Sequence, residues 1–222
     1  DACSQHDLWV IRDVILKNPL KILPVGSAAL FQELFTFGYG AGEAPCMVIC
    51  GSLNHQSRIQ IQKLVDLSIV GNIQIDLDRA LSEQRESEID RVVQLATGFY
   101  KEKRNLLIQT PGTPFSLNIK SGVSITDSLS SSIGQLIGIM VARLLKNIRI
   151  SGLILTGGSI AAEVIDQLDG KGIILVKGLS PVVPIGRLTG GPYDGLRVIT
   201  KGGGVGDKDI LVRSVKYLRN NH

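Results

Sequence analysis

Residues 152–168 read GLILTGGSIAAEVIDQL, and this stretch decides the fold class. An apolar run at 152–156 has the composition of a strand, the pair Gly157-Gly158 turns the chain, and a helix pattern follows. The same order of strand, glycine turn and helix recurs at 46–68 and at 197–218. We therefore predict an α/β fold, a mostly parallel sheet with helices on both faces.

Other stretches predict the remaining elements by the same rules. The other expected strands are short apolar runs at 21–25, 72–77, 106–110 and 173–176. The other expected helices cover 29–37, 83–103 and 133–145, and Asp207 is the expected N-cap of the closing helix. The segment 111–127 is loop-like, and no strand or helix is expected within 179–193. Either segment could face a partner domain or a subunit.

A cluster of glycines marks the expected internal boundary. Gly38, Gly40 and Gly42 predict a flexible joint, which separates residues 1–43 from residues 44–222. A length of 222 residues fits one large domain or a domain plus a fragment. Because the chain begins at Asp1 and not at Met, we expect it to be a piece of something longer.

Composition argues against several kinds of partner. The 24 basic and 20 acidic residues give a net charge of +4, scattered among only 5% aromatic residues, so we expect no nucleic-acid partner. The apolar run 136–141 is broken by Arg143, far short of the roughly eighteen residues that span a bilayer. We therefore expect no membrane association, and with no visible signal peptide a cytoplasmic location.

The cysteines favour a reduced and metal-free interior. Cys3, Cys46 and Cys50 are odd in number, and the latter two lie in an apolar run. We expect buried thiols in place of a disulfide framework or a zinc site.

Glycine-rich turns that follow predicted strands carry the functional signal. Gly51, Gly157 and Gly202 each begin such a turn, and a parallel sheet would gather these turns along one edge. Backbone N–H groups and a helix N-terminus suit phosphate, and glycine allows its close approach. The candidate ligand-binding residues are Ser52, Thr156, Gly157, Gly158, Lys201, Gly202, Gly203 and Gly204. The alternative is a structural domain whose glycines serve tight turns alone.

Familiar nucleotide and hydrolase motifs are absent or incomplete in the sequence. The chain holds no G-x-x-x-x-G-K-[ST] motif, and 202–206 falls short of G-x-G-x-x-G by one spacing. Ser159 lies where a nucleophile elbow would place a serine, but only His222 follows it, so we expect no triad. His55 lies beside the first turn, and we expect it to face solvent at the start of a helix.

The order of the glycine motifs resembles the four-carbon acid sugar kinase family, and the match to its nucleotide-binding domain runs from about residue 44 to the end. In chain order the motifs are Gly26-Ser27-Ala28, Cys50-Gly51-Ser52, Thr156-Gly157-Gly158-Ser159-Ile160-Ala161, Val183-Pro184-Ile185-Gly186, Gly190-Gly191-Pro192 and Thr200-Lys201-Gly202-Gly203-Gly204-Val205-Gly206-Asp207. Each motif alone is weak evidence, and their order and spacing make the resemblance specific.

The resemblance implies an ATP-dependent kinase that phosphorylates a hydroxyl of a short sugar acid such as a threonate, erythronate or 3-oxo-tetronate. Residues 44–222 would be its nucleotide-binding domain, and residues 1–43 the last strand and helix of its amino-terminal, substrate-binding domain. ATP would contact Ser52, Gly157, Gly158 and Gly202 to Gly204, with Mg²⁺ as the bridging cation. The sequence leaves the oligomeric state open and is compatible with a homo-oligomer.

This chain departs from the family pattern at several positions. Ser159 and Ile160 stand where the family commonly has Asp and Thr, which removes a carboxylate that could orient nucleotide or metal. Asn54 and Ser57 occupy positions where the family usually has Ser and Thr, and both can still form hydrogen bonds. Val205 occupies the position where the family usually has Phe.

The family's Asp-Asp-rich motif, the source of its substrate site and catalytic base, is not among these 222 residues. The catalytic residues are therefore expected in the amino-terminal domain. We expect the chain to bind nucleotide without turning over sugar acid at a useful rate. A non-catalytic nucleotide- or phosphate-binding module is the second alternative.

Overall fold

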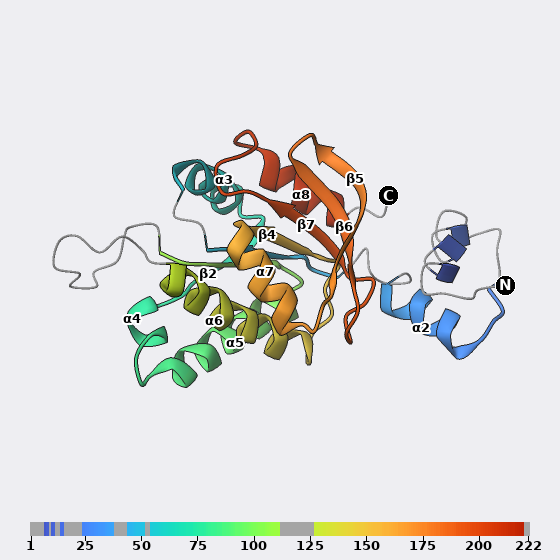
Figure 1. Cartoon of the computed structure of the whole chain (residues 1–222), viewed down its shortest axis with the longest axis horizontal. Coiled ribbons are helices and arrows are strands. Elements are labelled where there is room, and N and C mark those ends of the chain that lie inside the picture. Colours follow the sequence, from blue (N-terminus) through green and yellow to red (C-terminus); the bar gives the residue numbers. More distant parts are fainter. Residues whose placement is uncertain are drawn as a thin grey trace.

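A seven-stranded sheet forms the centre of the molecule (Figure 1). The structure, a computed structural model, describes residues 7–8, 10–11, 14–15, 24–37, 44–51, 54–111 and 127–219. The strands are β1 (Met47–Cys50), β2 (Val70–Gln74), β3 (Asn105–Gln109), β4 (Leu153–Thr156), β5 (Gly172–Ser180), β6 (Val183–Thr189) and β7 (Arg197–Lys201). Their order across the sheet is β2-β3-β1-β4-β7-β6-β5.

The first five strands in this order run parallel, and β6 and β5 form an antiparallel hairpin at the far edge. The predicted α/β class and mostly parallel sheet are therefore confirmed.

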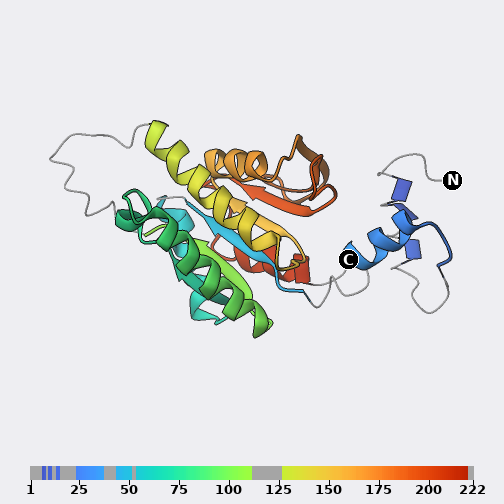
Figure 2. The same cartoon turned by 90° about the horizontal axis from the view of Figure 1, so that it is seen from below.

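Helices cover both faces of the sheet (Figures 1 and 2). The helices are α2 (Ala28–Phe37), α3 (His55–Asp66), α4 (Leu77–Ala80), α5 (Arg85–Lys101), α6 (Asp127–Leu145), α7 (Gly158–Gln167) and α8 (Ile210–Arg219). Buried residues of α5, α6 and α7 join one apolar cluster, and those of α3 and α8 join a second. Side chains of β1 alternate between the two faces of the sheet, so the strand contributes to both clusters. Met47 and Ile49 lie in the first cluster, and Val48 and Cys50 lie in the second.

The hairpin of β5 and β6 corrects the sequence prediction. In this region a strand was expected only at 173–176 and none within 179–193. Gly178, Pro184 and Gly186 are residue types that are rare inside strands, so local pattern gives no strand signal there. In the structure these residues pair across the hairpin, which carries two register shifts. Gly186 is required by close approach, since a Cβ there would lie 2.6 Å from the Ile174 carbonyl oxygen. Sequence patterns cannot show this approach, because the two residues meet only after pairing.

Other boundaries moved by a few residues. The strand expected at 72–77 is β2 at 70–74, because Asp76 caps α4 by accepting the Arg79 N–H at 3.1 Å. Asp207, the expected N-cap of α8, lies three residues before that helix and accepts the Asp209 N–H at 2.9 Å.

Some expectations fall outside the described residues. These are most of the strand at 21–25, the glycines of the joint at 38–42, and most of the segment 111–127. The described end of the expected strand at 21–25, Pro24 and Val25, is not in a strand, which corrects the prediction there. The physical reason is that Pro24 has no N–H to donate to a ladder. Among the described residues, no helix combines the length and apolar character needed to cross a membrane.

Candidate functional site

The carboxyl ends of three neighbouring strands define the candidate site. Cys50 of β1 pairs with Thr156 of β4, and Thr156 pairs in turn with Lys201 of β7. The turns that begin at Gly51, Gly157 and Gly202 therefore start side by side. From the adjacent β1 and β4, α3 leaves to one face of the sheet and α7 to the other. This is a topological switch point, where open α/β sheets bind ligands.

The turn after β4 places a helix N-terminus at this edge. Gly157 has φ of +104°, a conformation that side chains rarely adopt, and its N–H donates to the Lys201 carbonyl at 3.0 Å. Gly158 opens α7, and apart from its chain neighbours and the backbone of its own helix no atom of the described residues lies within 4 Å of the place that a Cβ would take. Ser159 is exposed in the first turn. The positive end of the α7 dipole is thus bordered by open space.

Thr156 places a buried hydroxyl at the end of β4. Its side chain is 0% exposed, and Oγ1 makes no hydrogen bond within the described part of the chain. A buried hydroxyl without a partner costs free energy, so such groups are uncommon unless water or a ligand satisfies them. Ser52, the other candidate hydroxyl, lies outside the described residues.

Lys201 is buried at the end of β7, with 4% of its surface exposed. Its Nζ donates to the carbonyl oxygens of Gly202 at 2.7 Å and Gly203 at 3.2 Å. Burial lowers the pKa of Lys201 below its ordinary value, and the neighbouring Cys50 thiol opposes that shift. Among the described residues no carboxylate pairs with Lys201, and its Nζ donates hydrogen bonds to backbone carbonyls instead.

Helix α3 holds the glycine-rich loop after β7, residues 202–207. Ser57 Oγ donates to the Gly203 carbonyl at 2.5 Å. Gln60 Nε2 donates to three consecutive carbonyls, those of Val205 (3.1 Å), Gly206 (3.0 Å) and Asp207 (3.0 Å). Asn54 caps α3 by accepting the Gln56 N–H at 2.8 Å. The first turn and the last turn are therefore joined through one helix.

Arg58 and Gln60 were missed by the sequence prediction. Arg58 donates to the carbonyls of Thr110 and Pro111, both at 2.8 Å, and so fixes the end of β3 beside the site. Burial lowers the pKa of Arg58, with Cys50 again opposing. A signal existed for Gln60, because Ser57, Gln60, Ile61 and Leu64 share one helical stripe and are buried together. Polar residues on a buried stripe need polar partners, but the sequence does not show which loop supplies them.

The other residues singled out from the sequence lie as follows. His55 is exposed at the first residue of α3, as expected. Ile160 is buried, and a Cβ on Gly51 would lie 2.6 Å from Ile160 Cδ1, so glycine is needed where α7 meets β1. Cys46 and Cys50 are fully buried, and burial raises the pKa of the Cys46 thiol to about 12.

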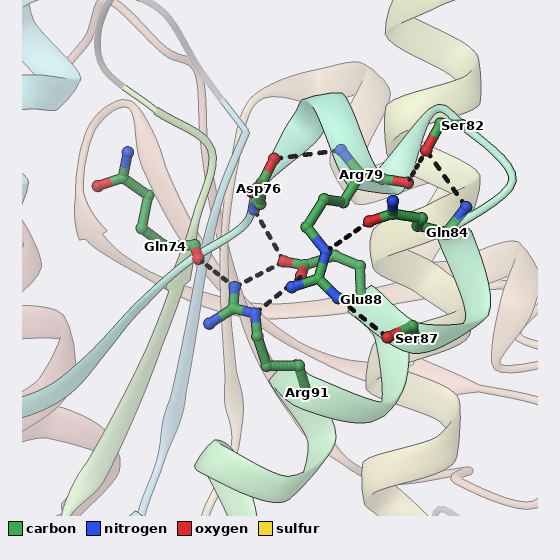
Figure 3. A network of polar contacts seen from close by, with 8 residues as sticks. All are labelled: Gln74, Asp76, Arg79, Ser82, Gln84, Ser87, Glu88 and Arg91. Atoms are coloured by element: carbon green, nitrogen blue, oxygen red, sulfur yellow. Dashed lines mark hydrogen bonds and ion pairs between the residues drawn. The ribbon is translucent and has the colours of Figure 1, made fainter.

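A second polar network lies at the carboxyl end of β2 (Figure 3). The carboxylate of Glu88 is fully buried and accepts two hydrogen bonds from Arg91, at 2.6 and 2.7 Å. It also accepts the Asp76 N–H at 2.8 Å, and Arg79 lies 3.9 Å away. This network joins α4 and α5 to β2, and its buried charge is fully paired inside the protein.

Comparison with known proteins gives one family and several relatives. The family model described as "Nucleotide-binding C-terminal domain" matches residues 47–211. D-threonate kinase of Salmonella typhimurium is 28% identical over 226 residues, covering 98% of this chain and 53% of that protein. D-erythronate kinase of Heliobacterium modesticaldum is 23% identical over 231 residues, covering 98% of this chain and 52% of that protein. The chain spans about half the length of the curated relatives it matches.

A solved structure from Bordetella bronchiseptica has a similar fold, with a TM-score of 0.66 and 25% sequence identity. The match covers 99% of this chain and 52% of that one. That protein is described as a domain of unknown function with bound citrate, in a domain-swapped dimer.

Proposed function

The chain belongs to the four-carbon acid sugar kinases, as their nucleotide-binding C-terminal domain, and on this basis we propose that it binds ATP with Mg²⁺. The ATP would phosphorylate a hydroxyl of a short sugar acid such as a threonate, erythronate or 3-oxo-tetronate. One observation carries the proposal. Three turns meet at the switch point of the sheet, where the Thr156 hydroxyl is buried and makes no hydrogen bond among the described residues.

The residues at this edge fit a polyphosphate. The α7 N-terminus, which begins at Gly158, offers the N–H groups of its first turn and open space, and Thr156 offers a hydroxyl. The Gly157 N–H itself is already donated to the Lys201 carbonyl. Lys201 adds a positive charge beneath Gly202, Gly203 and Gly204. Ser52 would complete the set from the first turn. In this assignment the protein positions the phosphates and neutralises their charge, which is most of the work in phosphoryl transfer.

Magnesium is proposed to enter with the nucleotide. Among the described residues, no group of three His, Cys, Asp or Glu side chains is arranged to hold a metal ion. Mg²⁺ usually keeps several waters and is held by substrate phosphates with one or two carboxylates, so a preformed cage is not required.

The sugar acid and the catalytic base are proposed to lie with the amino-terminal domain, of which residues 1–43 would be the end and the linker. We expect residues 44–222 to bind nucleotide without appreciable turnover. The domain-swapped dimer described for the Bordetella protein supports a homo-oligomer for this chain. A non-catalytic nucleotide-binding module is the second candidate, favoured by the exposed Ser159 where a carboxylate would orient nucleotide or metal.

Calorimetric titration of the 222-residue chain with ATP and ADP, with and without Mg²⁺, tests the proposal. We expect micromolar to millimolar binding that Gly203→Asp abolishes, because the variant places a negative charge in the last turn. Gly98→Asp is the matched control, since Gly98 lies on α5 with open space around its Cβ position. Absence of binding at millimolar nucleotide would contradict the proposal. Binding by a longer protein that contains the amino-terminal domain, without turnover of any four-carbon acid, would favour the second candidate.

A further inference from the structure

Helix α3 carries two kinds of buried side chain on one stripe. Ile61 and Leu64 pack into the apolar cluster beneath the sheet. Ser57 and Gln60, one turn nearer the site, are equally buried but polar. All of their donated hydrogen bonds go to carbonyl oxygens of the loop 202–207. A polar pair in an otherwise apolar stripe therefore serves this loop.

These contacts fix the direction of the loop's N–H groups. In a trans peptide the carbonyl of one residue and the N–H of the next point in opposite directions, and the chain has no cis peptide bond among its described residues. Ser57 holds the Gly203 carbonyl, so the Gly204 N–H points away from α3. Gln60 holds the Val205 carbonyl, so the Gly206 N–H points away as well.

Neither of these N–H groups has an acceptor among the described residues. The N–H of Val205, which lies between them, donates to the Gly202 carbonyl at 3.4 Å and closes the turn. Backbone N–H groups that a glycine-rich loop directs outward suit an anion such as phosphate. Four carbonyls of the loop thus point toward α3, and the N–H groups of Gly204 and Gly206 point away from it.

We infer that Gln60 is a positioning residue for the nucleotide phosphates, acting through the loop 202–207. The inference rests on the proposed function. Gln60 Nε2 has two hydrogens and lies within hydrogen-bond distance of three carbonyl oxygens, so the three share them. Because all three neighbours are acceptors, the amide atom that faces them must be the nitrogen and not the oxygen. Gln56 Nε2 adds a further donor to the Gly206 carbonyl at 3.0 Å. Ser57 has the same role at the Gly203 carbonyl.

The test uses Gln60→Met, which keeps the length of the side chain and removes its donors. Gln62→Met is the matched control, because Gln62 lies on the same helix and is exposed, and within the described part of the chain its side chain donates a hydrogen bond to Asp66 but none to the loop 202–207. Ser57→Ala is a second, smaller change that removes one hydroxyl and is less disruptive to folding. Two readouts are taken on the 222-residue chain: the ¹⁵N-glycine amide signals without ligand, and the Kd for ADP with Mg²⁺.

We expect Gln60→Met to shift or broaden the Gly206 amide signal and to raise the Kd for ADP about tenfold or more. Ser57→Ala should shift or broaden the Gly204 amide signal and raise the Kd for ADP about threefold to tenfold. Gln62→Met should leave both readouts unchanged.

Unchanged Gly206 and Gly204 signals in folded variants would overturn the inference whether or not nucleotide binds. Altered signals with unchanged Kd would make Gln60 a structural brace alone and would also overturn it. Should the wild-type chain bind no nucleotide while its amide signals depend on Gln60, the proposed function fails, and with it the role of the loop toward phosphate.

Discussion

Two groups of buried polar residues lie at the carboxyl edge of the same sheet, and they differ in how completely they are paired. At the end of β2, the Glu88 carboxylate meets two arginines and one backbone N–H (Figure 3). At the ends of β4 and β7, Thr156 Oγ1 has no partner and Lys201 has no carboxylate among the described residues. In the first group the buried charge is paired with opposite charge, whereas in the second a buried positive charge has no carboxylate partner among the described residues.

The difference is the one expected between a structural network and the proposed ligand site. The charge of the buried Glu88 carboxylate is already balanced by arginine inside the protein, and Glu88 raises the pKa of Arg91 through their hydrogen bond. A buried cation without a counter-charge favours an anionic ligand, and an unpaired hydroxyl provides one more hydrogen bond to it. The comparison therefore predicts that changes in the first group act on stability and changes in the second on binding.

Replacing Glu88 by Ala should give the largest loss of stability. The change leaves Arg91 and Arg79 facing a buried site without their counter-charge. We expect the free energy of unfolding to fall by about 3 kcal/mol, with the Kd for nucleotide within about twofold of wild type. Urea unfolding and calorimetric titration at one temperature measure the two effects.

Asp90→Ala is the control for this change. Asp90 lies on the same helix and pairs with Arg143 at 3.3 Å, but its side chain is 75% exposed. An exposed pair is expected to contribute no more than about 0.5 kcal/mol. Equal losses in the two variants would mean that burial of the Glu88 charge has no special weight, and the comparison would lose its basis.

Replacing Lys201 by Met should act in the opposite way. The variant keeps the apolar stem and removes the charge, so we expect nucleotide binding to weaken by about 1.5–3 kcal/mol, roughly 10- to 150-fold. Stability should change little, because relief from burying a charge offsets the loss of two hydrogen bonds. Lys208→Met is the control, an exposed lysine of the adjoining segment. A similar loss of affinity in both variants would indicate a general effect of charge.

The pH dependence of Lys201 has a definite sign. Burial lowers its pKa in the folded chain below 10.5, while the unfolded chain keeps the ordinary value. As pH rises through the folded pKa, Lys201 loses its proton, and affinity for the anionic nucleotide should fall. Between the two pKa values the unfolded chain binds more protons, so stability from this group should rise with pH. Affinity and stability are measured against pH for wild type and for Lys201→Met, and the difference between the two proteins isolates the contribution of Lys201. If wild type and variant showed the same pH dependence, the assignment to Lys201 would be contradicted.

The sequence sufficed for the parallel part of the fold because its signals are local. β1, β4 and β7, each with the helix that follows it, were found from an apolar run, a glycine turn and an amphipathic stripe. The β5–β6 hairpin was missed because Gly186 and Pro184 are acceptable only in the paired strands. Tertiary contact, which no local window contains, decided that region.

The candidate site shows the same division. Glycine turns after strands were visible in the sequence, and the register places three of them side by side. The contacts of Gln60 with the loop 202–207 cross 145 to 147 residues of chain. Arg58 reaches Thr110 and Pro111 in the same long-range way. Spacing alone could identify buried polar residues but not the carbonyls that receive their hydrogen bonds.

Thr156→Val gives the smallest effect and the sharpest test, because its two consequences differ in sign. Valine has nearly the shape of threonine without the hydroxyl that is buried and makes no hydrogen bond among the described residues. Stability should therefore hold or rise by up to about 1 kcal/mol, while nucleotide affinity falls about fivefold through the lost hydrogen bond. Thr97→Val is the same substitution at a hydroxyl that already donates to the Val93 carbonyl at 2.7 Å, and it should leave affinity unchanged. Loss of stability with full affinity in Thr156→Val would show that the hydroxyl has a hydrogen-bond partner inside the protein. The polar groups at the ends of β4 and β7 would then be paired internally, like those at the end of β2.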